Sequence, residues 1–344
     1  MGDRNTPHAP YDLLKVLRVL NRNCHFDGFD DVELFRLMSE PTALRSAALL
    51  PKAAAQLRQD IFVAAATGFQ RDGYFVEFGA TDGVYLSNTL LLERELGWTG
   101  LLAEPARVWH EGLASTRQAR IDTRCVYSTT GQTVAFREVA ADQALSTMVE
   151  YTGCDLHEPT RRTGQNYDVE TVSLVDLLDE HGAPDIIDYL SLDTEGSELA
   201  ILKAFDFSRY EFGVITCEHN NTPIRNDVLD LLVKHGYRRV LNGVSLFDDW
   251  YVHSSRIASL SESLPDWASV SHEEHSSDGV ALSDKDRTLA QLQDTVLNLI
   301  VDRDAHKNAL EKSMDVNEVL SKTIADLIVD RDAYKKLVER KGQK

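Results

Sequence analysis

Cysteine is scarce in this sequence, and long apolar runs are missing from it. The four cysteines, Cys24, Cys125, Cys154 and Cys217, are scattered without C-x-x-C spacing. This pattern indicates neither a disulfide framework nor a zinc site, so we expect reduced thiols. No stretch of about 18 apolar residues occurs, and the segment MGDRNTPHAPYD lacks the apolar core of a secretion signal. We therefore expect a cytoplasmic protein without a transmembrane segment.

Positive charge is also in short supply. Lys and Arg number 36 against 55 Asp and Glu, which gives a formal net charge of −19. Such an excess of negative charge repels phosphate backbones and anionic lipids, so we expect no nucleic-acid partner and instead a neutral or small one. The 344 residues, of which 43% are hydrophobic, have room for one large α/β domain and an appendage.

Apolar residues recur at helical spacing from Pro10 to about Phe69, which predicts an N-terminal helical region over residues 1–70. After Gly73 the pattern changes to short apolar runs that alternate with helical stretches, which is typical of βα units in a mostly parallel sheet. The predicted strands are 74–78, 100–103, 122–127, 187–192, 213–217, 237–241 and 249–253. Seven strands in that order suit a doubly wound sheet with a closing hairpin, in a domain that spans residues 71–253.

A long segment separates the third and fourth of these strands. Residues 133–139 predict an additional strand, whereas residues 140–170 are polar and irregular. We interpret residues 140–170 as a loop that faces the substrate, with Ser146 and Thr147 directed toward the acceptor or the cofactor. The alternative is a surface loop without a function of its own.

The last part of the sequence has a different character. Residues 254–284 are rich in Ser, Asp and Glu and are predicted to be a linker. Residues 285–344 place apolar side chains on an alternating three-and-four spacing, the seam of a coiled coil. LIVDRDAHK at 299–307 returns as LIVDRDAYK at 327–335, an offset of 28 residues that keeps both copies on one face. We expect homo-oligomerisation through this segment, as a dimer or a trimer; the alternative is a solvated helix or a disordered tail.

The segment YFVEFGATDGVYLSNTLLLERELGWTGLLAEP (74–105) combines a buried strand, a glycine loop, a helix and a second strand that ends in an acid. This order of elements is typical of sites for adenosine-containing cofactors. We expect Gly79 and Gly83 to let the ligand approach the backbone, and the start of the helix to receive an anionic group of the ligand. Glu104 is expected to accept hydrogen bonds from ribose hydroxyls.

Further positions are candidates for the same site. Ser87, Asn88 and Thr89 open the helix, where they either contact the cofactor or cap the helix. Three residues close the third predicted strand, where an adenine ring would rest: Cys125, Tyr127 and Ser128. Of these, Ser128 is expected to offer a hydrogen bond to the ring.

Acidic side chains follow two later strands. Asp193 and Glu195 come after strand 187–192, and Glu218 and His219 come after strand 213–217. Adjacent parallel strands lie about 4.8 Å apart, so these side chains should converge at one edge of the sheet. A carboxylate or imidazole there could remove a proton from a hydroxyl group. The same four residues, above all Asp193, Glu218 and His219, could instead hold Mg²⁺. The alternatives are helix capping by the first two acids and a structural role for the histidine.

These motifs together resemble the FkbM methyltransferases. The resemblance rests on YFVEFGATDGVYLSNTLLLE, GWTGLLAEP, TVSLVDLL, IDYLSLDTEGSEL, the EHN at 218–220 and HGYRRV before DDWYVH, from about Tyr74 to His253. It implies a Rossmann-like class I methyltransferase fold and transfer of a methyl group from S-adenosylmethionine to a hydroxyl, typically of a sugar or a polyketide. The residues implied for the cofactor are Glu77, Gly79, Ala80, Gly83 and Glu104. Those implied near the methyl acceptor are Asp193, Glu195 and Glu218 to Asn220, and we assign Asp193 to both sites. Thr81 stands where many members carry other small or polar residues, a departure that changes none of these expectations.

A methyltransferase with a coiled coil also resembles bacterial enzymes that cap a growing surface polysaccharide, where a rod sets the distance to the polymerising machinery. On this interpretation the acceptor is a glycan hydroxyl, and a glycosyltransferase partner holds the protein at the inner membrane. Two other classes stay open. An NAD-dependent sugar oxidoreductase is disfavoured by the missing third glycine and the lack of a Tyr-x-x-x-Lys pair. A non-enzymatic coiled-coil scaffold is disfavoured by the intact acidic positions.

Overall fold

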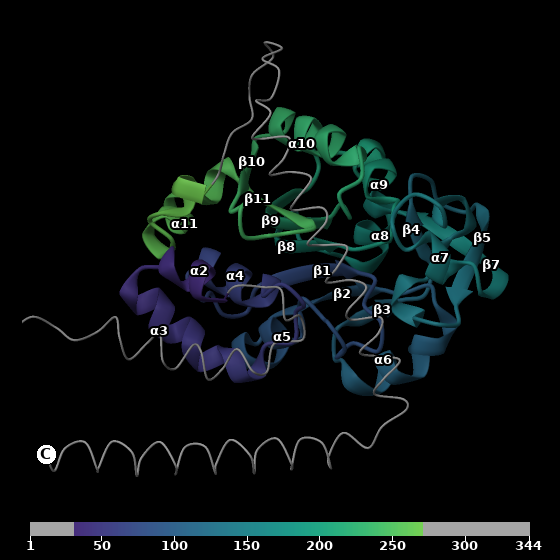
Figure 1. Cartoon of the computed structure of the whole chain (residues 1–344), viewed down its shortest axis with the longest axis horizontal. Coiled ribbons are helices and arrows are strands. Elements are labelled where there is room, and N and C mark those ends of the chain that lie inside the picture. Colours follow the sequence, from purple (N-terminus) through teal and green to yellow (C-terminus); the bar gives the residue numbers. More distant parts are fainter. Residues whose placement is uncertain (1–30, 271–344) are drawn as a thin grey trace, which may run out of the picture. The chain divides into compact units, whose positions relative to one another are not determined.

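The structure, a computed structural model, describes residues 31–270. These residues form an α/β fold in which helices cover both faces of a seven-stranded sheet, with a smaller four-stranded sheet beside it (Figure 1). The helices expected before residue 31 and the coiled coil expected at 285–344 lie outside the described residues.

Six of the seven predicted strands lie in the main sheet, and the predicted strand at 122–127 contributes only Asp122 to it. Its strands, in their order across the sheet, are β10 (Tyr237–Val240), β11 (Asp248–His253), β9 (Glu211–Glu218), β8 (Ile186–Leu192), β1 (Tyr74–Phe78), β2 (Thr99–Ala103) and β3 (Arg120–Asp122). From β3 to β9 every neighbouring pair is parallel, whereas β11 is antiparallel to both of its neighbours. The predicted α/β sheet with a closing hairpin is therefore confirmed, as a mixed sheet.

The remaining elements are as follows. The helices of the described chain are α2 (Asp31–Arg36), α3 (Glu40–Leu49), α4 (Gln59–Ala66), α5 (Leu90–Leu96), α6 (His110–Thr116), α7 (Glu158–Arg161), α8 (Leu174–His181), α9 (Glu198–Ala204), α10 (Ile224–Lys234) and α11 (Ile257–Ser263). The short 3₁₀ turns are η2 (Leu50–Lys52), η3 (Arg107–Trp109), η4 (Gln143–Leu145), η5 (Val149–Tyr151), η6 (Ser254–Arg256) and η7 (Trp267–Val270). The second sheet has the order β4 (Cys125–Tyr127), β7 (Gly164–Ser173), β5 (Thr133–Val139), β6 (Thr147–Met148).

Each face of the main sheet carries its own hydrophobic core. Successive side chains of a strand point to opposite faces, so Phe75 packs in the core under α4, α5, α6 and α11, while Val76 packs in the core under α8, α9 and α10. On the first face Phe62 stacks on Trp250, with ring centroids 4.5 Å apart. Both strand faces are covered, which explains why these strands appear in the sequence as continuous apolar runs.

One predicted strand is wrong as a single element. Residues 122–127 form the end of β3 and all of β4, and the two strands belong to different sheets. The chain turns at Asp122, whose carboxylate accepts hydrogen bonds from the backbone N–H of Arg124 at 2.9 Å and from its guanidinium at 2.6 Å. The hydrogen bonds of Asp122 therefore separate two short strands that the sequence predicts as one.

The segment 140–170 is more ordered than its sequence suggests. Its end forms the start of the ten-residue strand β7, which pairs antiparallel with the predicted strand at 133–139, β5, over seven positions. Seven of the ten β7 residues are not buried, and the buried ones, Val169, Thr171 and Val172, come late in the strand. The strand therefore has no clear hydrophobic period. We call residues 125–173, which hold the second sheet, the insertion.

The first residues of the predicted linker are also folded. Residues 254–270 form η6, α11 and η7, and Leu260 and Leu264 are fully buried. The carbonyl of Ser263 accepts the backbone N–H of Ser39 at 2.9 Å, and Arg256 pairs with Asp188 at 2.8 Å. The described part of this stretch therefore packs on the main sheet and on the N-terminal helices.

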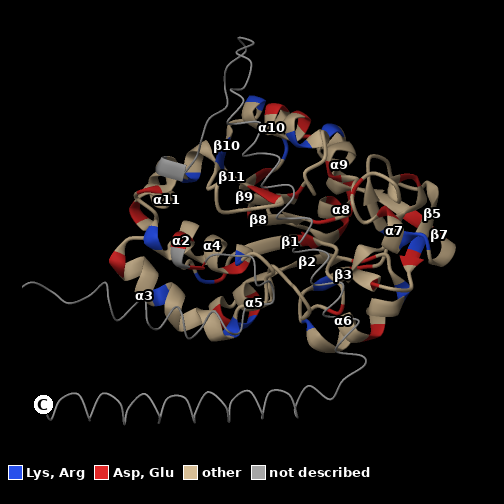
Figure 2. Ribbon diagram, in the orientation of Figure 1, with Lys and Arg blue, Asp and Glu red and all other residues tan. Residues whose placement is uncertain are grey.

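The described residues show mixed surface charge and lack a membrane-spanning helix. In the view of Figure 2, Lys and Arg are scattered among Asp and Glu along the helices. Within residues 31–270, no helix combines the length and the apolar character that crossing a bilayer requires. Cys125, Cys154 and Cys217 are free thiols.

Candidate functional site

The centre of the sheet is its topological switch point. From β1 the chain continues to β2 on one side, and from β8 it continues to β9 on the other, while β1 and β8 pair directly. In open α/β sheets, ligands bind outside the carboxyl ends of the strands at such a point. Gly79 follows β1 and Asp193 follows β8, so these two residues flank the switch point.

The two loops touch there. Gly79 has a φ of +74°, and a Cβ atom on it would stand 2.1 Å from the backbone oxygen of Asp193. Gly83 has a φ of +79°, and a Cβ atom on it would meet Arg117 at 2.5 Å and Leu113 at 2.8 Å. Both glycines are therefore required by close packing within the chain, whereas the sequence had suggested close approach by a ligand.

Glu77 organises the loop that follows. This buried carboxylate accepts hydrogen bonds from the backbone N–H of Asn88 at 2.7 Å and from the hydroxyls of Ser87 at 3.1 Å and Thr89 at 2.5 Å. The Ser87 hydroxyl oxygen in turn accepts the backbone N–H groups of Thr89 and Leu90. The backbone N–H groups of Asn88, Thr89 and Leu90 are thus paired already, which differs from the expectation that the start of the helix receives an anionic group of the ligand.

Glu104 lies at the end of β2 and ties the glycine loop to that strand. Its Oε2 accepts the backbone N–H of Thr81 at 2.9 Å, and its Oε1 accepts that of Ala106 at 2.8 Å. Burial raises the pKa of Glu104 to about 7. Each carboxylate oxygen keeps a second lone pair that a ligand hydroxyl could use. Ala80, another expected cofactor residue, is buried in the hydrophobic core.

Asn88 offers an unused polar atom at the switch point. Its Nδ2 donates to the Ser191 hydroxyl at 2.9 Å, and Ser191 lies on β8, two positions before Asp193. The buried Oδ1 of Asn88 has no hydrogen-bond partner among the described residues. A buried polar atom without a partner is costly, so it favours a site that a bound ligand completes.

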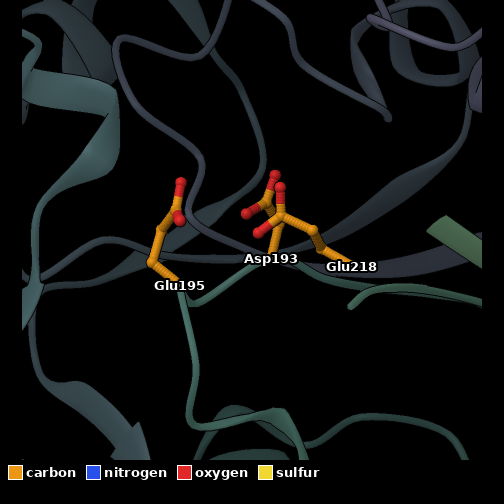
Figure 3. A group of neighbouring side chains, drawn as sticks. All are labelled: Asp193, Glu195 and Glu218. Atoms are coloured by element: carbon orange, nitrogen blue, oxygen red, sulfur yellow. The ribbon is translucent and has the colours of Figure 1, made fainter. Parts of the chain in front are cut away.

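Three carboxylates meet beside the glycine loop. The ligand oxygens of Asp193, Glu195 and Glu218 lie within 4.8 Å of one another, and Figure 3 shows the first and third closest together. Burial, with repulsion from Glu198, raises the pKa of Asp193 to about 7, while a hydrogen bond from Glu218 opposes the rise. Burial and the charge of Asp193 also raise the pKa of Glu218 well above its usual value. Such a cluster holds a proton readily near neutral pH.

The pKa of Glu195 is raised by burial and by Asp193, while the Arg161 charge opposes this rise. Its Oε2 lies 2.5 Å from the Arg161 Nη2, and the Asn220 Nδ2 donates to the same oxygen at 3.5 Å. Glu195, one of the acids predicted after β8, is therefore in contact with the insertion through Arg161.

His219 is turned away from these carboxylates. Its Nδ1 accepts the backbone N–H of Asn221 at 3.0 Å, and its Nε2 lies 3.8 Å from Asp249. Burial lowers the pKa of His219 to about 4. A neutral imidazole with one nitrogen already accepting a hydrogen bond is poorly suited to remove a proton. The structure also does not bring His219 together with the three carboxylates.

The remaining candidates lie in or near the insertion. Ser128 follows β4 in the second sheet, because the strand that was expected to carry it to the main sheet is divided. Cys125 is buried, and burial together with the Glu104 charge raises its pKa to about 12. The hydroxyl of Thr147 donates to the carbonyl of Glu195 at 3.1 Å, whereas that of Ser146 donates within its own turn.

Two buried arginines were missed by the sequence analysis. Arg117 donates to the carbonyl of Gly83 at 3.2 Å and to the Ser87 hydroxyl at 3.0 Å, and Arg161 pairs with Glu195. Both stand in polar stretches without a motif or a hydrophobic period. Their importance comes from acids that are distant in the sequence, so no local signal could have identified them.

Comparisons with known proteins agree with the resemblance to FkbM enzymes. Residues 77–239 match the family described as Methyltransferase FkbM domain. No curated protein sequence matches the chain. Among solved structures, the chain is similar to a precorrin-6y C5,15-methyltransferase from Geobacter metallireducens, with 12% identity, 56% of this chain and 85% of that chain covered, and a TM-score of 0.31. It is also similar to the methyltransferase domain of METTL16, with 13% identity, coverage of 61% and 77%, and a TM-score of 0.34.

Proposed function

Because residues 77–239 match the Methyltransferase FkbM domain family, we propose that the chain is an S-adenosylmethionine-dependent O-methyltransferase. The observation that supports this most directly is the contact between the Gly79 loop and Asp193 at the switch point. It joins the loop expected to bind the cofactor to the acids expected to face the methyl acceptor. Positioning of two reactants side by side is the main requirement of direct methyl transfer.

The residues at the switch point fit S-adenosylmethionine. Glu104 would accept hydrogen bonds from ribose hydroxyls through the lone pairs that Thr81 and Ala106 leave unused. The buried Oδ1 of Asn88 lacks a partner among the described residues and would receive a donor of the ligand. When bound, the cofactor supplies an electrophilic methyl group on a sulfonium.

The acid cluster would take up the proton of the acceptor hydroxyl. Asp193 is the best base, since its pKa of about 7 lets a carboxylate oxygen accept a proton near neutral pH. Glu218 shares that proton by its hydrogen bond, and Glu195 is partly neutralised by Arg161. Carboxylate oxygens are also ligands that Mg²⁺ prefers. Methyl-transfer rates measured with and without EDTA separate the two mechanisms, because proton removal by Asp193 without a metal predicts equal rates.

A sugar in a bacterial glycan is the acceptor that we favour. Neutral polyols match a site edge lined by carboxylates and the Asn220 amide, because these groups accept and donate hydrogen bonds to hydroxyls. The repeated nonapeptide at 299–307 and 327–335 supports a homo-oligomeric spacer that sets polymer length beside a glycosyltransferase. Deleting residues 285–344 should change glycan length. Unchanged length would remove the spacer role and leave methyl transfer untouched.

The choice between enzyme classes is tested by ligand-induced stabilisation. A ligand that binds the folded state raises its melting temperature. We expect S-adenosylmethionine and S-adenosylhomocysteine to raise it and NAD to leave it unchanged. Stabilisation by NAD would favour an oxidoreductase, and no response to millimolar S-adenosylmethionine would favour a scaffold. A screen of mono- and disaccharides with labelled donor then identifies the acceptor.

A further inference from the structure

Arg161 is a fully buried arginine on α7, in the insertion. Its Nη1 and Nη2 donate to the two carboxylate oxygens of Asp155 at 2.5 and 3.0 Å, and its Nε donates to the carbonyl of Leu145 at 3.0 Å. Nη2 also lies 2.5 Å from Oε2 of Glu195, a residue of the loop after β8. One guanidinium thus links the insertion to the acid cluster of the main sheet.

The loop after β8, residues 193–198, is named here the acid loop. Its backbone is unusual at Glu195, which has a φ of +60°. This left-handed conformation is unfavourable for a residue with a side chain and persists only where the surroundings impose it. Within the loop, Glu198 accepts the backbone N–H of Thr194 at 2.9 Å and of Gly196 at 3.1 Å.

The insertion imposes the conformation from the other side. The Thr147 hydroxyl donates to the carbonyl of Glu195 at 3.1 Å. Gly196 packs so closely that a Cβ atom on it would stand 2.9 Å from the Cys154 sulfur and 3.1 Å from the Cβ of Tyr151. The acid loop therefore lies directly against the insertion, and Arg161 is the charged contact between them.

A buried ion pair adds little to stability by itself, because burial removes both charges from water. A guanidinium that binds carboxylates through several fixed donors does, however, define their orientation. We infer that Arg161 is a positioning residue, which acts through Glu195 to hold the acid loop where Asp193 meets Gly79 and Glu218. Its consequence for catalysis rests on the proposed function.

The insertion then has a supporting role. The sequence suggests that residues 140–170 form a loop that faces the substrate, whereas Arg161, Thr147 and Tyr151 of this segment contact the acid loop and support it. The acids expected to face the methyl acceptor would thus lie on a loop that both the main sheet and the insertion hold in place. Loss of the support should loosen the acid loop before it affects the strands.

Amide hydrogen exchange of the full chain tests the inference without an acceptor. Arg161→Lys keeps the charge but cannot bind Asp155 and Glu195 with the same fork, and Arg161→Met removes the charge. We expect amides of residues 193–198 to exchange about tenfold faster or more in Arg161→Met, and by a smaller factor in Arg161→Lys, with β1 unchanged. Should Arg161→Met fail to fold, the lysine variant alone decides.

The matched control is Arg162→Met. Arg162 is adjacent in sequence, its side chain is 70% exposed, and it pairs with Glu158 on the surface. Its exchange should equal that of the wild type. Unchanged exchange of residues 193–198 in both Arg161 variants, or an equal acceleration in β1, would overturn the inference, because the arginine would then act on nothing or only on global stability.

Kinetics supply the second readout. With labelled S-adenosylmethionine and the sugar of highest turnover, Arg161→Lys should lower kcat by about 10²-fold and leave the KM for the cofactor within about twofold. A rise in cofactor KM with unchanged kcat would contradict a role at the acid loop. If the wild type transfers no methyl group to any sugar while exchange depends on Arg161, the proposed function fails and the positioning role stands.

Discussion

The backbone oxygen of Asp193 lies 2.1 Å from the place that a Cβ atom on Gly79 would occupy. The loops after β1 and β8 are therefore in direct contact, and any side chain at residue 79 must push them apart. This contact brings the acid cluster and the glycine loop side by side.

Gly79→Ala should be strongly destabilising for two reasons, the positive φ and the collision with Asp193. The control is Gly131→Ala, since Gly131 has a similar φ of +78° but no atom within 4 Å of an added Cβ. The control should lose only about 1–2 kcal/mol of unfolding free energy. Gly79→Ala should lose clearly more in the same denaturant titration. Equal losses would show that the two loops do not press on each other.

Asp193→Asn and Glu218→Gln should separate chemistry from cofactor binding. If Asp193 accepts the proton of the hydroxyl, kcat should fall by about 10²- to 10⁴-fold. The dissociation constant of S-adenosylmethionine should change by less than about tenfold. Asp230→Asn on the exposed surface of α10 is the control.

A variant of His219 tests whether the imidazole, and not Asp193, is the general base. Because its pKa is lowered to about 4 and its Nδ1 is already an acceptor, His219→Asn should lower kcat by less than about tenfold. The pH dependence of kcat in each variant is the measurement. A loss as large as that of Asp193→Asn would return the base role to the imidazole.

Asp248 makes stability depend on pH. Its buried Oδ2 accepts a hydrogen bond from Gln59 at 2.8 Å, and burial raises its pKa to about 8. The folded state therefore binds the proton more tightly than the unfolded state between about pH 4 and pH 8, and the free energy of unfolding falls as pH rises through that window. Asp248→Asn should make this decline less steep by up to about 1.4 kcal/mol per pH unit. Urea titrations at several pH values in the window check it, and identical slopes would contradict the burial argument.

Phe62 packs α4 against the main sheet. Its ring stacks on Trp250 of β11 with centroids 4.5 Å apart, so Phe62→Ala should cost about 3–5 kcal/mol of unfolding free energy. Leu44→Ala on α3 is the control, since that side chain is 57% exposed, and its loss should stay within about 0.5 kcal/mol. Comparable losses in thermal unfolding would mean that α4 is not part of the core.

Much of the main sheet could be predicted from the sequence, because its strands are buried on both faces and appear as apolar runs. The strand at 122–127 could not, since the turn at Asp122 depends on its side-chain bonds with Arg124. β7 was missed because its first five residues are polar or only partly buried and its buried residues, Val169, Thr171 and Val172, show no regular period. Periodicity shows burial only where one face is uniformly apolar.

At the site, the acids at strand ends could be predicted because the ends of parallel strands meet at one edge of the sheet. The sequence does not show which polar atoms already have hydrogen-bond partners within the chain. Ser87 and Glu77 hold each other and the start of α5, and His219 faces Asp249. The partners of Arg161 are also distant in sequence, so its role depends on the tertiary structure alone.

Titration of S-adenosylmethionine into the wild type, Glu104→Gln and the exposed control Glu111→Gln tests the central claim most directly. The glutamine amide at 104 would face the N–H of Thr81 or Ala106 and would offer a ribose fewer acceptor oxygens. We predict saturable binding by the wild type and the control, and binding weaker by about tenfold or more in Glu104→Gln. Equal affinity in all three proteins, or no binding by the wild type, would contradict the account.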